Sequence, residues 1–265
     1  MNSQQSQELA QPELVALFVS DIHLSPALPK TTSAFLAFLK QKATQAKQLY
    51  ILGDLFEYWV GDDDIADDYN QEIVSALEVL TTSGVELFWI AGNRDFLVGS
   101  LFAETTGAKL LPDPSTVSIA GLNIVICHGD AQCTDDTDYI KFRTMVRNPE
   151  WQKQFLSRPL SERKLIVQSM RMNSKSEQAK KDSDIMDVNS DAIAKLFEAS
   201  ACYIMIHGHT HRPARHPEMG KYRYVLPDWD VDTDKHRGGW LGIFDDGKII
   251  LSDLNGQEIE GTVIS

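Results

Sequence analysis

The sequence has few cysteines, an overall shortage of basic charge and no long apolar run. Its three cysteines, Cys127, Cys133 and Cys202, lack a metal-type spacing, so we expect neither a structural zinc site nor a disulfide, as in a reducing compartment. No apolar run approaches the roughly 18 residues of a membrane-spanning helix, which leaves only peripheral membrane contact. The formal net charge of -13 argues against indiscriminate nucleic-acid binding, because a polyanion would be repelled.

The first thirteen residues have none of the features of a signal peptide. Residues 1–13 are polar, with neither a basic stretch nor an apolar segment, so we expect a flexible extension and a chain that stays in the cytosol. With 265 residues and a hydrophobic content of 43%, the remainder is long enough to bury a substantial core. We assign residues 14–265 to a single domain.

Short apolar runs alternate with helical patterns along the first half of the chain. Strands are expected at 14–19, 49–52, 85–91, 122–127 and 203–206, and helices at 32–46, 69–82 and 97–106. This alternation is typical of βαβ units. Antiparallel pairing is expected from a hairpin at Gly121 and from late strands at 223–226, 240–244 and 249–254. We predict an α/β fold, a sandwich of two mixed β-sheets flanked by helices.

Residues 134–200 interrupt this pattern with about four helical stretches. Between Lys141 and Lys181, eleven Lys and Arg residues stand against three Glu residues, a net charge of +8 in a chain that is otherwise acidic. Pro149 and Pro159 are expected to break the helices. We therefore expect a basic helical cap inserted over the site. Its apolar residues either pack the cap onto the core or hold acyl chains along an open face.

A side chain able to bind a metal follows each of five expected strands. The blocks are Ser20-Asp21-Ile22-His23, Gly53-Asp54, Gly92-Asn93-Arg94-Asp95, His128-Gly129-Asp130 and His207-Gly208-His209-Thr210-His211. Ligands of open α/β sheets bind beyond the carboxyl ends of the strands, so one cleft should collect these groups. Asp, Asn and His suit Mn, Fe or Zn, and one bridging carboxylate can hold two ions about 3.5 to 4 Å apart. A single block is more often a capped loop or a turn, but five in register are not.

The order of these blocks resembles the calcineurin-like metallophosphoesterase family. The resemblance implies that one ion is held by Asp21, His23, Asp54 and His211, and the other by Asp54, Asn93, His128 and His209, with Asp54 shared. It also implies that Asn93, Arg94 and His209 act in catalysis and contact the substrate. We expect two divalent ions, with Mn²⁺ as the expected species. The family usually has His where this chain has Arg94, which can clamp phosphate oxygens but cannot donate a proton at neutral pH.

Further blocks resemble the branch of this family that hydrolyses UDP-2,3-diacylglucosamine in lipid A biosynthesis. They are residues 53–57, 92–96, 128–130, 185–189 and 207–213, and little agreement is expected after Pro213. The resemblance implies a metal-dependent hydrolase that cleaves the pyrophosphate to UMP and 2,3-diacylglucosamine 1-phosphate. It implies peripheral association with the cytoplasmic face of an anionic inner membrane. It also implies substrate contacts from Asp136, Tyr139, Arg171, Ser174, Gln178 and Lys181.

Two other functions stay open at this point. One is a general metal-dependent phosphodiesterase or phosphatase of the same fold, and the other is a metal-binding scaffold without catalysis. We expect a monomer with no nucleic-acid partner. Two acidic runs are not assigned to metals: residues 62–68 are expected in a solvated loop, and residues 228–234 lack the Gly and Glu of an EF-hand loop.

Overall fold

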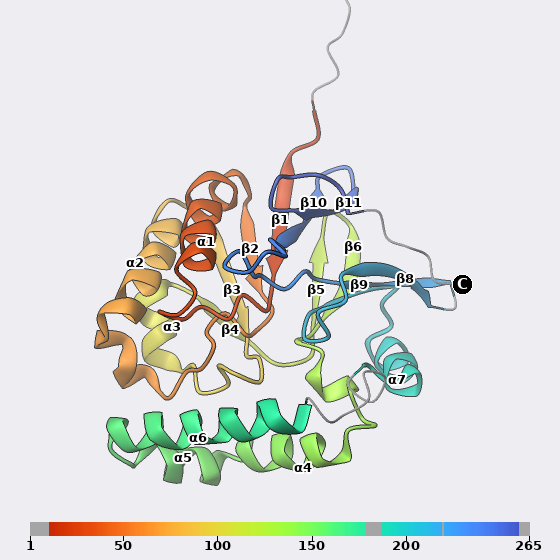
Figure 1. Cartoon of the computed structure of the whole chain (residues 1–265). Coiled ribbons are helices and arrows are strands. Elements are labelled where there is room, and N and C mark those ends of the chain that lie inside the picture. Colours follow the sequence, from red (N-terminus) through yellow and green to blue (C-terminus); the bar gives the residue numbers. More distant parts are fainter. Residues whose placement is uncertain (1–10, 179–186, 219, 260–265) are drawn as a thin grey trace, which may run out of the picture.

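The computed structural model describes residues 11–178, 187–218 and 220–259, with only the backbone for residues 172–178. Two β-sheets pack face to face, and helices cover both outer faces (Figure 1). Residues 1–10 of the expected extension lie outside the described residues. In the described part of the chain, no helix is both long and apolar enough to cross a membrane.

The first sheet has six strands in the order β11-β10-β1-β2-β3-β4. Their bounds are Ile249–Asp253, Gly239–Phe244, Leu14–Val19, Gln48–Ile51, Glu86–Ile90 and Lys109–Leu111. Strands β1 to β4 run parallel, whereas β10 is antiparallel to both β1 and β11. The parallel strands are joined in turn by α1 (Pro29–Gln41), α2 (Asp68–Thr82) and α3 (Ser100–Thr106). The predicted βαβ units are confirmed.

The second sheet has five strands in the order β5-β6-β7-β9-β8. Their bounds are Ser115–Ile119, Leu122–Ile126, Ile204–His207, Lys221–Val225 and Ala214–Glu218. Strands β5 and β6 form the hairpin expected at Gly121, and β6, β7 and β9 run parallel. Both sheets are therefore mixed, as predicted.

Residues along β1 alternate between two cores. Leu17 and Val19 belong to the core beneath the helices, whereas Ala16 and Phe18 belong to the core between the sheets. Successive side chains of a strand point to opposite faces, so a strand buried on both faces reads as one apolar run. The ring of Phe18 stacks on that of Tyr50 with a centroid distance of 4.6 Å. These buried runs fix the ends of the strands from which the site is built.

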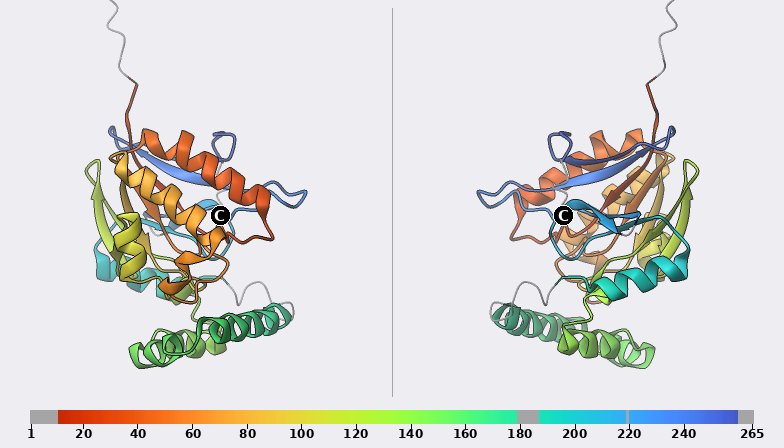
Figure 2. Two further views of the ribbon diagram at one scale, coloured as in Figure 1. Left: turned by 90° about the vertical axis from the view of Figure 1, so that its left-hand side faces the viewer. Right: turned by 90° about the vertical axis from the view of Figure 1, so that its right-hand side faces the viewer.

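Three helices form a separate layer at the end of the sandwich where the parallel strands finish (Figures 1 and 2). They are α4 (Thr137–Val146), α5 (Pro149–Leu156) and α6 (Leu160–Gln178). The fourth helix of the insertion, α7 (Ser190–Ser200), packs instead on the second sheet, where Ile193 and Phe197 share a core with Val125 and Met205. The layer over the site consequently comprises α4 to α6, which we call the cap.

The acidic run at residues 62–68 faces solvent only in part, because Asp63, Asp67 and Asp68 are exposed as expected, whereas Asp62 and Asp64 are not. Asp62 accepts hydrogen bonds of 3.0 Å from the backbone N–H groups of Gly99 and Phe102 and so caps α3. Asp64 is only 4% exposed and lies 2.6 Å from Lys164 Nζ on α6, and Asp63 pairs with Arg163 of the same helix. The sequence shows these acidic residues, but it does not show that they bind α3 and α6.

Candidate functional site

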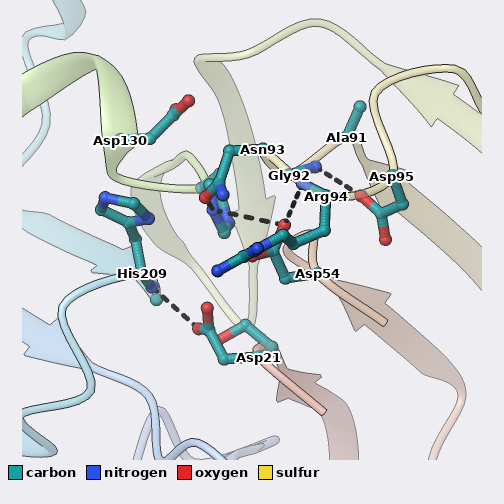
Figure 3. A network of polar contacts seen from close by, with 12 residues as sticks. Asp21, Asp54, Ala91, Gly92, Asn93, Arg94, Asp95, Asp130 and His209 are labelled. Carbon is teal, nitrogen blue, oxygen red and sulfur yellow. Dashed lines mark hydrogen bonds and ion pairs between the residues drawn. The ribbon is translucent and has the colours of Figure 1, made fainter. Parts of the chain in front are cut away.

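The predicted ligand residues meet in one cleft at the carboxyl ends of the strands. They follow β1, β2, β3, β6 and β7, which come from both sheets. Figure 3 shows Asp21, Asp54, Asn93, Arg94 and His209 grouped beyond these strand ends. The same cleft is lined by His23 and His211. The prediction that strand order would bring these side chains together is confirmed.

One group of possible metal ligands consists of Asp21, His23 and His211, whose ligand atoms all lie within 4.8 Å of one another. The Nε2 atoms of the two histidines are 3.3 Å apart, and His211 Nε2 is 3.4 Å from Asp21 Oδ1. Asp21 Oδ1 is buried and accepts no hydrogen bond from any residue that the structure describes. A buried, unpartnered carboxylate oxygen facing two imidazoles fits a divalent cation.

A second group consists of Asp21, Asp54 and His128. His128 Nε2 lies 3.7 Å from Asp54 Oδ1 and 2.9 Å from Asn93 Oδ1, so the amide oxygen of Asn93 joins the group. His209 approaches through its ring, which is 5.1 Å from that of His128. In this arrangement Asp21 belongs to both groups and Asp54 to the second, whereas the family resemblance implied Asp54 as the shared ligand.

Five of the predicted ligands adopt a left-handed backbone. Their φ angles are 53° for Asp21, 54° for His23, 54° for Asp54, 68° for His209 and 55° for His211. Such a conformation is uncommon outside glycine and costs about 1 to 3 kcal/mol per residue, so it persists only where the surroundings impose it. Concentrated on residues that share one cleft, this cost is typical of a functional site.

Glycines beside the ligands allow the backbone to approach the carboxylates closely. A Cβ atom at Gly92 would lie 2.1 Å from Asp54 Oδ1, and one at Gly208 would lie 2.1 Å from Asp21 Oδ2. Asp95 holds the same loops together, because it accepts hydrogen bonds of 2.8 Å from the backbone N–H groups of Gly92 and Leu55. The Gly-Asp, Gly-Asn and Gly-His pairs of the sequence are therefore requirements of space as well as of chemistry.

Burial and mutual charge set the protonation states in the cleft. Burial lowers the pKa of His128, but the carboxylates of Asp54 and Asp21 outweigh it and raise the pKa to about 9. Burial, with the charge of His128, lowers the pKa of His209 to about 4, so His209 is neutral near pH 7 and able to ligate. For Asp21, burial acts against ionisation, yet His211 and the other imidazoles hold its pKa below the usual range.

The Nδ1 atoms of three predicted ligands each face an oxygen atom, although the contact of His23 lacks hydrogen-bond geometry. His128 Nδ1 lies 2.8 Å from the carbonyl oxygen of Leu52. His23 Nδ1 is 3.2 Å from a carboxylate oxygen of Glu57, and His211 Nδ1 is 3.4 Å from one of Asp228. A carboxylate or carbonyl on one ring nitrogen fixes the tautomer and leaves Nε2 for the metal. The sequence interpretation assigned no role to Glu57, and it set Asp228 aside with the acidic run at 228–234.

Arg94 lies against the metal ligands. Its backbone N–H donates a 2.8 Å hydrogen bond to Asp54 Oδ1, and its Nε is 3.9 Å from Asp54 Oδ2. That Nε is buried and has no hydrogen-bond partner among the described residues. The guanidinium group lines the cleft, where its donors are available to an anionic substrate.

A buried ion network holds Tyr139 beside His209. The Tyr139 hydroxyl donates a 2.6 Å hydrogen bond to Asp130 Oδ2, which also accepts from Arg143 Nε at 2.9 Å. Arg143 in turn pairs with Asp113 at 3.0 Å. The Tyr139 ring centroid is 5.9 Å from that of His209. Asp130, from the His-Gly-Asp block, thus connects the cap helix α4 to the body.

The cleft joins the metal ligands to an apolar wall of the cap. It encloses a cavity of about 630 Å³, and the cap lines it with Phe142, Val146, Trp151, Phe155, Val167 and Met170. Among the expected substrate contacts, Asp136, Tyr139 and Arg171 line this cavity. The side chains of Ser174 and Gln178, and all of Lys181, lie outside the described residues.

Comparisons with known proteins agree with this geometry. A family model described as calcineurin-like phosphoesterase matches residues 14–213. Three relatives named UDP-2,3-diacylglucosamine hydrolase cover most of the chain. The protein from Yersinia pestis is 48% identical over 220 residues, 82% of this chain and 91% of the relative. The protein from Aromatoleum aromaticum is 46% identical over 222 residues, 82% and 90% of the two chains, and that from Photorhabdus laumondii is 44% identical over 243 residues, 90% and 99%.

The fold and the cleft define a metal-dependent phosphoester hydrolase. The chain belongs to the calcineurin-like phosphoesterase family and, within it, to the group of relatives named UDP-2,3-diacylglucosamine hydrolase. Divalent metal ions are its cofactors, consistent with the two ligand groups of the cleft.

The similarity also extends past Pro213, contrary to expectation. The match to the Photorhabdus relative covers 90% of this chain, whereas residues 1–213 are 213 of 265 residues, about 80%. This segment contacts the site, because Trp229 is buried and its backbone N–H donates a 3.0 Å hydrogen bond to the carbonyl oxygen of Asp21. With Asp228 on His211, this segment supports the metal centre.

Proposed function

We propose that this protein hydrolyses the pyrophosphate of UDP-2,3-diacylglucosamine to UMP and 2,3-diacylglucosamine 1-phosphate, with Mn²⁺ as its metal. The observation that carries the proposal is the continuity of one cavity from the metal ligands to the apolar wall of the cap. A pyrophosphate bearing two acyl chains needs an anion-binding end and an apolar end in the same cleft. The relatives at 44 to 48% identity carry the name of this activity.

Side chains of the two groups would hold the ions together with Asn93 and His209, with Asp54 proposed as the shared ligand. Asp21, His23, Asp54 and His211 are proposed for one, and Asp54, Asn93, His128 and His209 for the other. When bound, the ions polarise the phosphate oxygens and lower the pKa of a bound water to near neutrality. The pKa of His209 is about 4, so its ring is neutral near pH 7 and a ring nitrogen can bind a metal ion.

Arg94 and Asn93 are proposed to position the uridylyl phosphate. The guanidinium of Arg94 can clamp two phosphate oxygens, since it lines the cleft beside Asp54 with its Nε unpartnered among the described residues. Attack of a water oxygen at this phosphorus forms UMP and breaks the bond from the phosphorus to the bridging oxygen. The bridging oxygen departs as part of the sugar 1-phosphate. A phosphate leaving group has a second pKa near 6 and needs no proton at pH 7. This accounts for Arg where the family usually has a histidine.

The acyl chains are proposed to lie along the cap, with Tyr139, Asp136, Arg171, Ser174, Gln178 and Lys181 contacting the nucleotide sugar. We further propose peripheral contact with the cytoplasmic face of an anionic inner membrane. Exposed apolar residues of the cap, including Met145 at 45% and Leu165 at 66%, occur within the segment of net charge +8. We also propose that the protein acts as a monomer.

A substitution in the apolar wall tests the link between cavity and lipid. Phe155 is only 5% exposed and stacks on Trp151 at 5.1 Å, so truncating either residue would also weaken packing. Phe142 lines the cavity yet is 37% exposed. We expect Phe142→Ala to lower kcat/KM for the diacylated substrate by about tenfold, from a loss of roughly 1.5 kcal/mol of apolar contact. Hydrolysis of a small chromogenic diester should not change.

The matched control is Val79→Ala, which removes an apolar side chain of α2 that is 69% exposed and lies outside the cap. This variant should hydrolyse both substrates at the wild-type rate. Equal losses on the lipid and on the chromogenic diester in a stably folded Phe142→Ala protein would defeat the acyl-binding role of the cap.

A further inference from the structure

Glu57 contacts the metal centre and the cap at the same time. Its Oε2 lies 3.2 Å from Nδ1 of His23, and its Oε1 pairs with the guanidinium of Arg171 on α6. The side chains of Glu57 and Arg171 are only 17% and 19% exposed, so the pair is partly shielded from solvent. A single carboxylate therefore joins a predicted metal ligand to a cap residue that lines the cleft.

The same segment of chain seats the cap helix at a second place. The guanidinium of Arg163, which is only 2% exposed, hydrogen-bonds the carbonyl oxygen of Val60 and pairs with Asp63. Lys164 lies 2.6 Å from Asp64. These partners and Glu57 all belong to residues 57–64, which follow β2 and the ligand Asp54. Helix α6 is thus held at Arg163, Lys164 and Arg171 by the loop that leaves the metal site.

Asp228 can be compared with Glu57, because each carboxylate lies beside the Nδ1 atom of a predicted ligand. It orients His211 through Nδ1 at 3.4 Å, as Glu57 orients His23. Its other charged partner is Arg237 at 2.6 Å, and both residues belong to the loop between β9 and β10. The two carboxylates therefore serve neighbouring histidines in the same way, but only Glu57 reaches the cap.

We infer that Glu57 is a positioning residue that couples the cap helix α6 to the metal centre. One carboxylate oxygen orients His23 for ligation, and the other anchors Arg171 at the wall of the cleft. Loss of the carboxylate removes the oxygen that lies 3.2 Å from His23 Nδ1 and leaves the Arg171 charge without this anchor. The consequence is a joint defect, weaker metal binding and a loosened cap, which loss of Asp228 does not produce.

The test compares Glu57→Gln with Asp228→Asn in the full chain, without substrate. Mn²⁺ affinity is measured by titration, and backbone hydrogen exchange is followed over residues 160–171 of α6. Both variants should bind Mn²⁺ about 10 to 100 times more weakly, as loss of a carboxylate on a ligating histidine does. Only Glu57→Gln should accelerate exchange in α6. Wild-type Mn²⁺ affinity, or wild-type exchange in α6, in the Glu57→Gln protein would overturn the inference.

Arg171→Met supplies a second variant that leaves the Glu57 contact to His23 in place. It should reproduce the faster exchange of α6, and the double variant Glu57→Gln/Arg171→Met should exchange no faster than either single variant. Additive acceleration in the double variant would show that the two residues act separately and would overturn the coupling.

A kinetic arm rests on the proposed function, whereas the two measurements above do not. At saturating Mn²⁺, Asp228→Asn should recover a KM within about twofold of wild type, and Glu57→Gln should keep a raised KM because Arg171 has lost its anchor. Full recovery of both variants would reduce Glu57 to a support for His23 and contradict its role in the cap. A wild-type protein that fails to cleave the substrate would refute the proposed function, while Mn²⁺ affinity and exchange would still decide the role of Glu57.

Discussion

Oδ1 of Asp21 lies 3.4 Å from Nε2 of His211, although 190 positions separate the two residues in the sequence. Asp21 follows the first strand of one sheet and His211 follows a central strand of the other. The contact exists because the parallel strands of both sheets end on the same side of the sandwich. Both groups of ligand atoms include Asp21, so the metal centre spans the junction of the two sheets.

Removal of either central carboxylate should abolish the metal centre. Asp21→Ala and Asp54→Ala should each lower turnover by several orders of magnitude, because each removes a ligand and a buried negative charge. The fold should largely survive, since both residues lie beyond the strand ends. Metal content by elemental analysis, together with circular dichroism, checks this prediction. Two bound ions with full activity in either variant would refute the assignment.

Metal binding should release a proton near neutral pH. The pKa of His128 is about 9 in the metal-free protein, so its ring is protonated at pH 7 and must lose a proton before Nε2 can ligate. The apparent affinity should rise roughly tenfold per pH unit up to about pH 9. Calorimetric titration with Mn²⁺ in buffers of different ionisation enthalpy measures the proton count, which should be at least one at pH 7, because the pKa of His211 is also raised, with burial outweighed by the carboxylate of Asp21. An affinity independent of pH between 6 and 8 would contradict it.

The same raised pKa affects the stability of the metal-free fold. A histidine with a folded pKa above its unfolded value of about 6.5 stabilises the fold below pH 6.5, and this contribution is lost as the pH rises through 9. The contribution of His128 should therefore lower the melting temperature of the metal-free protein as the pH rises from 6.5 to 9. His128→Asn should flatten the change.

Close approach of backbone to carboxylate should make Gly208 irreplaceable. A methyl group there would lie 2.1 Å from Asp21 Oδ2 and 2.2 Å from Ser20 Oγ. We expect Gly208→Ala to lose Mn²⁺ binding and to cost about 1 to 3 kcal/mol of unfolding free energy, as overpacking does. Gly84→Ala is the control, because Gly84 has a φ of +103° but open space around it. That variant should lose stability and keep its metals.

Arg94 should act as a clamp and not as a proton donor. Arg94→Ala should lower kcat/KM by about 10² to 10³, the usual cost of losing one group that stabilises transition-state charge. Arg94→His should not restore the rate, since a phosphate leaving group needs no general acid. Steady-state kinetics on the purified variants decide between the roles. A fully active Arg94→His enzyme would contradict the clamp.

The ligand blocks and most strands were predictable because they depend on short-range patterns. Burial on both faces makes β1 one apolar run, and Asp, Asn or His follows soon after each such run. Strands β4 and β8 were missed for a physical reason. Both are sheet edges, β4 has only three residues, and β8 carries Pro217 among polar residues, so neither needs an apolar run.

Partners from distant segments could not be predicted in the same way. Glu57 and Asp228 are unremarkable acidic residues until the fold brings each to the Nδ1 atom of a histidine. The left-handed backbone of Asp21 and His211 likewise leaves no trace in a single sequence. The sequence therefore predicts the candidate ligands, whereas their orientation depends on tertiary contacts.

The most direct test of the account is product analysis with UDP-2,3-diacylglucosamine in isotopically labelled water. The purified protein with Mn²⁺ should yield UMP and 2,3-diacylglucosamine 1-phosphate, with one labelled oxygen in UMP, and a chelator should stop the reaction. Label in the sugar phosphate would place the attack on the other phosphorus. An intact substrate, with ready hydrolysis of simple diesters, would contradict the proposed function and leave only a general phosphodiesterase.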